Sequence, residues 1–196
     1  MKKFLPLLVI LVLAFFVFQW GTGIYNNMVR KQEGVNAAWS QVENVYQRRL
    51  DLIPNLVETV KGVANFEKET YTAVAEARSK AGQVTLGPET INDPAAFERF
   101  QQTQGELSGA LSRLLVAVER YPELKANQNF LELQSQLEGT ENRIAVERNR
   151  FNEVARDFNA YLRVFPNSMI AGFGKFTPKP YFEATEAAKE APKVQF

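Results

Sequence analysis

RRLDLIPNLVETVKG, residues 48–62, is the stretch that decides how the first half of this chain folds. The apolar rhythm of a helix runs through it, with stripe positions at Tyr46, Arg49, Ile53, Leu56 and Val60. Pro54 interrupts the helix, because an interior proline removes a hydrogen bond and costs about 3 kcal/mol. Asn55 and Glu58 have the spacing of an N-terminal capping box. We therefore favour a tight corner at residues 51–54 between two antiparallel helices; the alternative is one long helix kinked at Pro54.

The rest of the body also follows helical spacing. One stripe continues from the corner through Val63, Glu67, Thr70, Val74 and Ala77. A second contains Phe97, Phe100, Gln104, Leu107, Leu111, Leu114, Val118 and Tyr121. A third contains Leu137, Glu141, Ile144, Arg148, Phe151, Ala155, Phe158, Leu162 and Phe165. Such stripes are the seams between packed helices, and Trp39, Phe100 and Phe151 are expected in the core.

Two further loops divide these stripes, at residues 82–94 and at Tyr121-Pro122, and Asp93 before Pro94 is a candidate helix cap. With the corner at residues 51–54, the four segments have comparable lengths. The predicted fold is therefore all-α, with an antiparallel up-and-down four-helix bundle over residues 25–165. The kinked alternative gives three long helices, of which the first would far outreach its partners.

An apolar segment precedes this body. Residues 4–24 begin with FLPLLVILVLAFFVF and span about 30 Å as a helix, which matches a bilayer core. Lys2 and Lys3 lie in a basic flank, residues 1–3, so a cleavable signal peptide is the alternative to a transmembrane anchor. We favour the anchor, because Gly21-Thr22-Gly23 is the sole small-residue cleavage motif. The positive-inside rule points to a cytoplasmic N-terminus and a body outside the cytoplasm.

Composition excludes several functions. The chain has no cysteine and no histidine, which removes thiolate and imidazole chemistry and cysteine-type zinc sites. Its 23 basic and 22 acidic residues nearly cancel, so there is no electrostatic footprint for nucleic acid. No catalytic residue, cofactor or metal ligand is assigned, and the protein is predicted not to be an enzyme.

The C-terminal tail, residues 166–196, has a different character. FPNSMIAGFGKFTPKPYF contains Pro, Gly and aromatic residues without a helical period, so it is expected to drape over the bundle. The final EATEAAKEAPKVQF is polar and expected to be loose.

Several stretches together resemble the LemA family. They are YNNMV, AWSQVENVYQRRLDLIPNLVETVKG, TYTAVAEARSKA, YPELKANQNFLELQSQLEGTENRIAVERNRFNEVARDFN and FPNSMIAGFGKF…YFE, between about residues 24 and 183. The segment NFEKET departs from the family, because many members have a histidine there. The resemblance implies a single-pass protein of the bacterial inner membrane with an up-and-down four-helix domain and no established enzymatic activity. It also implies a loose link to membrane organisation and to membrane proteases.

Polar residues within the stripes predict a buried polar layer. With the corner at Pro54, Glu67, Gln104 and Glu141 fall at one level, and Arg148 lies two turns away. We expect Arg148 to pair with Glu141 or Glu67, in a layer that fixes helix register. Arg49 is expected to anchor the end of the core, with Glu119 or Glu132 as partners. The competing interpretation, a hard-cation site between the two glutamates, lacks the Glu-x-x-His motif of di-iron bundles.

The predicted architecture suggests two interaction surfaces. Residues 48–55 and 121–127 are expected at the tip, where Arg48, Asp51 and Lys125 form a candidate partner surface. Aromatic residues are expected at the membrane interface, namely Trp20, Tyr25, Phe165, Phe173, Phe176, Tyr181 and Phe182. The leading functional hypothesis is a homo-oligomeric membrane scaffold. The second is an adaptor or regulator of a membrane protease or other membrane enzyme, and the third is a carboxylate-based cation-binding bundle.

Overall fold

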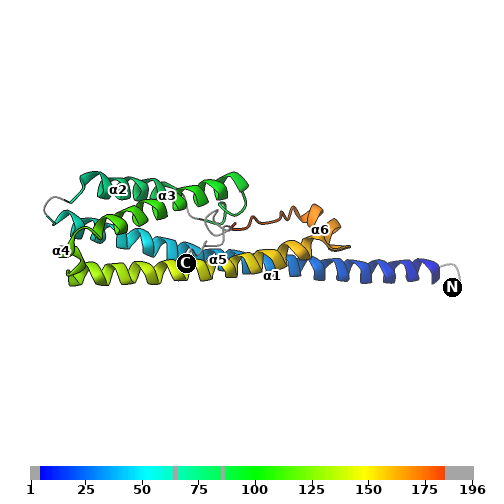
Figure 1. The fold of residues 1–196 in the computed structure, drawn as a ribbon. Coiled ribbons are helices and arrows are strands. Elements are labelled where there is room, and N and C mark those ends of the chain that lie inside the picture. The colour runs from blue at the N-terminus through cyan, green and yellow to red at the C-terminus, as the bar shows by residue number, and fades with distance from the viewer. Residues whose placement is uncertain (1–4, 64–65, 85–86, 184–196) are drawn as a thin grey trace, which may run out of the picture.

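The computed structural model describes residues 5–63, 66–84 and 87–183, and over these residues the regular elements are all helices (Figure 1). The basic flank, Phe4 and the tail beyond Glu183 lie outside the described residues. The helices are α1 (Leu5–Lys61), α2 (Lys68–Gln83), α3 (Pro94–Val118), α4 (Pro122–Lys125), α5 (Gln128–Arg163) and α6 (Asn167–Gly174).

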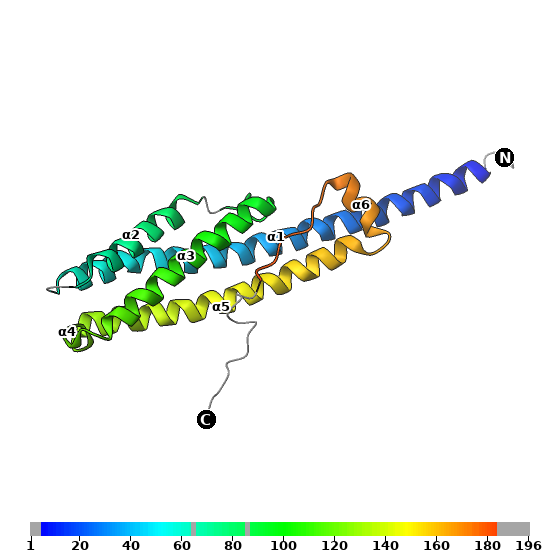
Figure 2. The same ribbon diagram turned by 45° about the horizontal axis from the view of Figure 1, so that its top comes forward.

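The two longest helices, α1 and α5, lie side by side, and α2 and α3 form a shorter pair beside them (Figures 1 and 2). The N-terminal part of α1 projects from one end of this body, which we call the proximal end. The short helix α4 lies at the opposite, distal end, and α6 packs on α1 and α5 near the projecting segment. Because α2 has 16 residues and α5 has 36, α2 covers only the distal part of the body.

Pro54 lies inside α1, and the predicted corner at residues 51–54 is wrong. The helix runs through Pro54 from Leu5 to Lys61, as the alternative interpretation required for this stretch. Because Pro54 has no N–H, the carbonyl of Leu50 one turn earlier loses its helical donor. Arg78 of α2 replaces it, since its Nε donates to the Leu50 carbonyl oxygen at 2.9 Å. A side chain of the next helix thus offsets part of the cost of the proline.

The chain turns between Lys61 and Lys68, a position that neither interpretation assigned. Aromatic packing holds this turn. The ring of Phe66 lies 6.5 Å from that of Tyr71 and 4.7 Å from that of Tyr121, measured between ring centroids. The distal tip of the body is therefore formed by this turn and by the α3–α5 connection.

Two predicted caps have different outcomes. Asp93 caps α3 as expected, since its carboxylate accepts from the backbone N–H of Ala95 at 2.9 Å, and Pro94 occupies the first turn. Asn55 does not cap a helix. It lies within α1, where its carbonyl accepts from the Thr59 hydroxyl at 2.8 Å.

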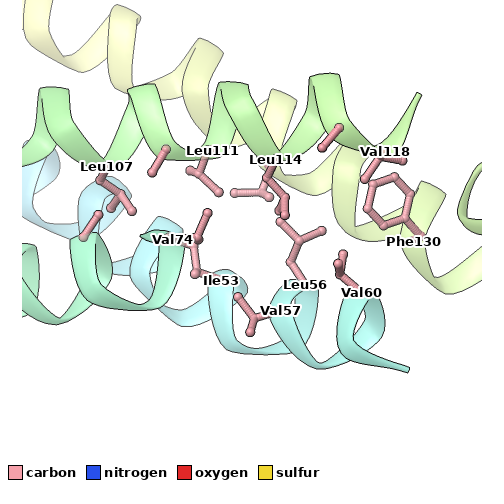
Figure 3. Close-up of a cluster of buried hydrophobic side chains, with 14 of the residues drawn as sticks. Ile53, Leu56, Val57, Val60, Val74, Leu107, Leu111, Leu114, Val118 and Phe130 are labelled. Atoms are coloured by element: carbon pink, nitrogen blue, oxygen red, sulfur yellow. The ribbon is translucent and has the colours of Figure 1, made fainter. Parts of the chain in front are cut away.

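The apolar stripes form two cores. The distal core joins α1, α2, α3, α4 and α5 (Figure 3) and contains Leu50, Ile53, Leu56, Val57, Val60, Phe66, Val74, Ala77, Ala81, Leu107, Ala110, Leu111, Leu114, Ala117, Val118, Leu124, Phe130 and Leu137. The proximal core contains Ile24, Met28, Val35, Ala38, Trp39, Val42, Tyr46, Ile91, Phe97, Phe100, Ile144, Phe151, Ala155, Phe158, Leu162, Ala171 and Phe182. The burial predicted for Trp39, Phe100 and Phe151 is confirmed.

Arg78→Met is expected to destabilise the fold, because the Leu50 carbonyl then loses its donor. An unpaired buried acceptor costs about 1–3 kcal/mol. In a Pro54→Ala background the same change is expected to cost much less, since alanine restores the backbone N–H that Leu50 needs. Urea unfolding of the four proteins in detergent, followed by circular dichroism, measures the difference.

Arg113→Met is the matched control, because Arg113 is an exposed arginine of α3. Its effect is expected to stay within about 0.5 kcal/mol in both backgrounds. An equal cost of Arg78→Met with and without Pro54 would show that Arg78 does not replace the missing N–H.

Candidate functional site

Arg49 is the most deeply buried charged residue among those described, with 1% of its surface exposed. Its Nη1 donates to the Ser108 hydroxyl at 2.9 Å and to a Glu141 carboxylate oxygen at 2.8 Å. Its Nη2 donates to the side-chain oxygen of Gln104 and, at 3.4 Å, to the Gln104 backbone carbonyl. The guanidinium carbon lies 5.0 Å from the centre of the Tyr46 ring. Arg49 therefore joins α1 to both α3 and α5.

Arg49 and its partners Gln104, Ser108 and Glu141 form a layer that separates the two cores, which we call the arginine layer. Tyr46 belongs to the proximal core and Leu50 to the distal core, with Arg49 between them on α1. In the Arg49–Glu141 pair only the arginine is buried, and the Glu141 side chain is 44% exposed. A wrong register of the helices would leave the buried arginine charge unpaired, which is strongly unfavourable. Within the described residues, Arg49 Nε and Gln104 Nε2 are buried without a hydrogen-bond partner. We interpret the layer as a device for register.

The predicted polar layer is only partly assembled. Arg49, Gln104 and Glu141 meet, but Glu141 pairs with Arg49, and the expected Arg148–Glu141 pair is not the observed one. Arg148 instead donates to the carbonyl of Glu183 at 2.8 Å. Glu67 lies at the distal turn, where it pairs with Arg120 at 2.7 Å.

The partners predicted for Arg49 are engaged elsewhere. Glu119 pairs with Lys125 at 2.6 Å, and the carboxylate of Glu132 accepts from Gln136 at 3.3 Å. Glu67 and Glu141 are held by different arginines at different levels, so they do not form the cation site considered from the sequence. Across residues 5–63, 66–84 and 87–183, no group of three or more acidic residues is placed to hold a metal ion.

The C-terminal tail is bound to α5 by two asparagines. Asn159 donates to the Lys179 carbonyl at 2.9 Å and accepts from the Lys179 N–H at 2.8 Å. Asn152 makes the same reciprocal pair with Phe182, both at 2.8 Å. Because the two asparagines are seven residues apart, they lie on one face of α5. The tail from Lys179 to Glu183 is thus fastened along the helix by backbone hydrogen bonds.

This fastening places Phe182 in the proximal core, and its predicted position at the membrane interface is wrong. Its ring lies 6.1 Å from Trp39 and 4.9 Å from Phe97, between centroids. Arg148 covers it from outside, with the guanidinium carbon 4.7 Å from the ring centre. The sequence signal for this docking is the asparagine pair on α5, because a side-chain amide can both donate to and accept from the backbone of an extended segment.

The other predicted interface aromatics have mixed positions. Trp20, Tyr25 and Phe173 are exposed at or beyond the proximal end. Phe176 packs on Tyr25 with ring centroids 5.4 Å apart, and the Tyr181 hydroxyl accepts from Asn159 at 2.8 Å.

Burial changes the acidity of three groups near these contacts. It raises the pKa of the Tyr46 phenol above its usual value, although the cations of Arg148 and Arg49 oppose the change. It lowers the pKa of Lys179, whose ammonium group contacts Asn92 and the Phe158 ring. Burial also raises the pKa of the Glu43 carboxyl. None of these groups forms a nucleophile–base pair with a neighbour in the described residues, so they do not indicate catalysis.

A groove runs along α3 and α5 beside the arginine layer. Its first cleft, about 480 Å³, is lined by Tyr46, Arg49 and Arg148 among others. A second cleft of about 400 Å³ shares Ser108 and Glu141 with the first. A third, about 260 Å³, reaches the distal end. The apolar lining of the second and third clefts includes Leu111, Leu115, Val118, Phe130, Leu131 and Leu137.

The candidate partner surface is not a single patch. Arg48 and Asp51 are exposed on α1, well before its distal end, and Asp51 accepts from Gln47 at 2.8 Å. Lys125 lies in α4 at the tip, paired with Glu119. The predicted grouping depended on the corner at Pro54.

Over the residues that the structure describes, these features define an all-helical protein with one helix long and apolar enough to cross a membrane. The most apolar 18-residue window of that helix has a mean hydropathy of 2.0, and 6% of the window is buried. The sequence profile of the LemA family matches residues 38–196, which is most of the chain, so the chain belongs to the LemA family.

Named relatives include protein LemA of Metamycoplasma hominis, 25% identical over 87% of this chain and 73% of its own length. Magnetosome protein MamQ of Magnetospirillum gryphiswaldense is 25% identical over 83% of this chain. Magnetosome protein MamQ 2 of Paramagnetospirillum magneticum matches to the same extent. The alignment covers 66% of each MamQ protein, slightly less than two thirds of its length.

Arg49 and Glu141 are expected to be energetically coupled. In a double-mutant cycle of Arg49→Met and Glu141→Gln, the coupling energy should reach about 0.5–3 kcal/mol, the range for residues in direct contact. The cycle of Arg148→Met with Glu141→Gln is the control and should be additive within about 0.5 kcal/mol. Urea unfolding in detergent measures both. Coupling confined to Arg148 and Glu141 would contradict the observed pairing.

Proposed function

We propose that this chain is a single-pass protein of the bacterial inner membrane that acts as a non-enzymatic, self-associating scaffold. The observation that carries the proposal is the continuity of α1, a single helix of 57 residues from the apolar segment into both cores. A helix without a break transmits orientation, so the membrane anchor and the body form one stiff unit. In this proposal residues 4–24 span the bilayer and the body is an antiparallel, up-and-down helical bundle.

The proposed scaffold extends far from the membrane. Residues 25–61 of α1 extend about 55 Å at the rise of an α-helix. The positive-inside rule favours a body on the outer side of the membrane. A stiff, elongated body of this kind suits an assembly in which copies associate through their sides or tips. Exposed Val116, Leu131 and Val146 on α3 and α5 supply apolar surface for that association.

The chemistry of the interior supports a non-enzymatic function. The charged groups of the arginine layer are directed at one another, and Arg49 is shielded from solvent by α1, α3 and α5. The Ser108 hydroxyl accepts a hydrogen bond from the Arg49 cation. A nucleophilic serine needs a base next to its hydroxyl to take the proton, and a cation cannot do so. The names of the relatives are not those of enzymes.

A second candidate function is an adaptor that presents clients to a membrane protease or other membrane enzyme. The groove along α3 and α5 favours it, because an apolar groove with polar ends suits an amphipathic helix of a partner. Leu131 is exposed beside the distal part of this groove and reports on its occupant.

A photo-crosslinking amino acid at position 131, in the full chain expressed in cells, tests both functions. The scaffold predicts crosslinks between copies of this chain, and mass photometry after detergent extraction is expected to show oligomers. The matched control is position 76, where the exposed Glu76 lies on α2 rather than beside the α3–α5 groove, and where crosslinking is expected to be weaker.

A strictly monomeric protein without crosslinks between copies would contradict the scaffold. Crosslinks from position 131 to one other membrane protein would support the adaptor instead. Crosslinks that are equally strong and equally diverse at positions 131 and 76 would contradict both proposals, because neither the groove nor its rim would then select a partner.

A further inference from the structure

The membrane-proximal helix α6 exposes a row of large apolar side chains. Met169 and Phe173 lie one turn apart on α6, with 57% and 88% of their surfaces exposed. Phe165 precedes them by four residues in the turn before α6 and is 80% exposed. Single exposed apolar residues are common on soluble proteins, but a pair one helical turn apart with a third exposed aromatic residue in the adjoining turn indicates an interaction surface.

The opposite side of α6 is tightly held against the body. Ala171 is buried in the proximal core, and the Asn167 side chain donates to the Tyr161 carbonyl at 2.9 Å. Gly174 allows a close approach, because a Cβ there would lie 2.6 Å from the Phe176 ring and 3.2 Å from that of Tyr25. The exposed row therefore has a fixed direction relative to α1.

The row lies where the apolar segment of α1 meets the body. Residues 8–18 of α1 are all exposed, and from residue 8 onward Ile24 is the first buried residue of that helix. Ile24 shares its core with Ala171 of α6. Figure 2 shows α6 beside α1 at the place where the N-terminal part of α1 leaves the body. If residues 4–24 cross a bilayer, α6 lies at its surface.

We propose that α6 is a second membrane contact, which seats Phe165, Met169 and Phe173 in the boundary between headgroups and acyl chains of an anionic bilayer. The inference rests on the membrane anchoring proposed above. Arg163 and Lys175 flank the row and are exposed, so they are placed to meet anionic headgroups. The position of α6 beside the point where the exposed apolar segment of α1 leaves the body favours lipid as the occupant over a second copy of the chain.

A second contact changes the mechanics of the anchor. With one transmembrane helix alone, the stiff unit of anchor and body is free to tilt in the bilayer and to rotate about the axis of α1. With α6 also seated in the interface, the long axis of the body has a preferred angle and one face turned toward the bilayer. This restriction would present the same sides of every copy to its neighbours.

Depth-dependent tryptophan quenching tests the proposal on the full chain in vesicles. The native Trp20 is removed by Trp20→Phe, and buried Trp39 remains as an internal report on the fold. Phe173→Trp is compared with Val116→Trp, an exposed position two residues before the end of α3, which leads into α4 at the distal end. The vesicles contain phosphatidylcholine and phosphatidylglycerol, with and without brominated acyl chains.

The Phe173→Trp emission is expected to shift to shorter wavelength and to be quenched by brominated lipid, whereas the Val116→Trp control is not. Combining Arg163→Gln with Lys175→Gln, or omitting phosphatidylglycerol, should reduce the quenching. If position 173 is unquenched while the unmodified Trp20 is quenched, the α6 contact is wrong and the anchor stands. If neither position 173 nor Trp20 is quenched, both the membrane anchor and the α6 contact are wrong. A blue shift at position 173 without quenching would indicate contact with a second copy of the chain, and it would also overturn the lipid contact.

Discussion

The carbonyl oxygen of Leu50 is the group on which the rest of this structure depends. Pro54 cannot donate to it, and a helix that broke here would fold back on itself. Because Arg78 of α2 donates to that oxygen, α1 continues for two further turns beyond Pro54. The distal turn then falls between Lys61 and Lys68. The second helix, α2, therefore begins at Lys68 and not directly after Pro54, where the predicted corner would place it. The position of every later helix follows from this continuity.

The same continuity gives the interior its two-part organisation. Arg49 lies one residue before Leu50, and its guanidinium lies between α3 and α5. There it donates hydrogen bonds to Gln104 of α3 and Glu141 of α5. On the distal side, α1, α2, α3, α4 and α5 enclose an apolar core. On the proximal side, the fastened tail supplies Phe182 and completes the core around Trp39. The arginine layer between them penalises slippage of α1 against its neighbours.

Periodicity predicted the apolar faces of α3 and α5 and the apolar N-terminal helix, because those features depend on local sequence. The continuation of the helix through Pro54 could not be predicted from local sequence. The group that offsets the cost of the proline is the side chain of Arg78, which lies 24 residues later in the chain. Moving the turn by about ten residues shifts α2 by about 15 Å along its axis, which is why Glu67 lies at the tip and not beside Glu141. Phe182 was misplaced because its docking depends on Asn152 and on the fold of α5.

A stiff helix from the apolar N-terminal segment to the tip underlies both the proposed scaffold and the proposed α6 contact. The most direct test is the distance between spin labels on Ser40→Cys and Glu58→Cys, at exposed positions in a chain that has no native cysteine. Double electron–electron resonance should give one distance of about 27 Å, from 18 residues at the α-helical rise. A corner at residues 51–54 would bring the labels to about 15 Å, from helices packed 8–10 Å apart, and that result would contradict the account.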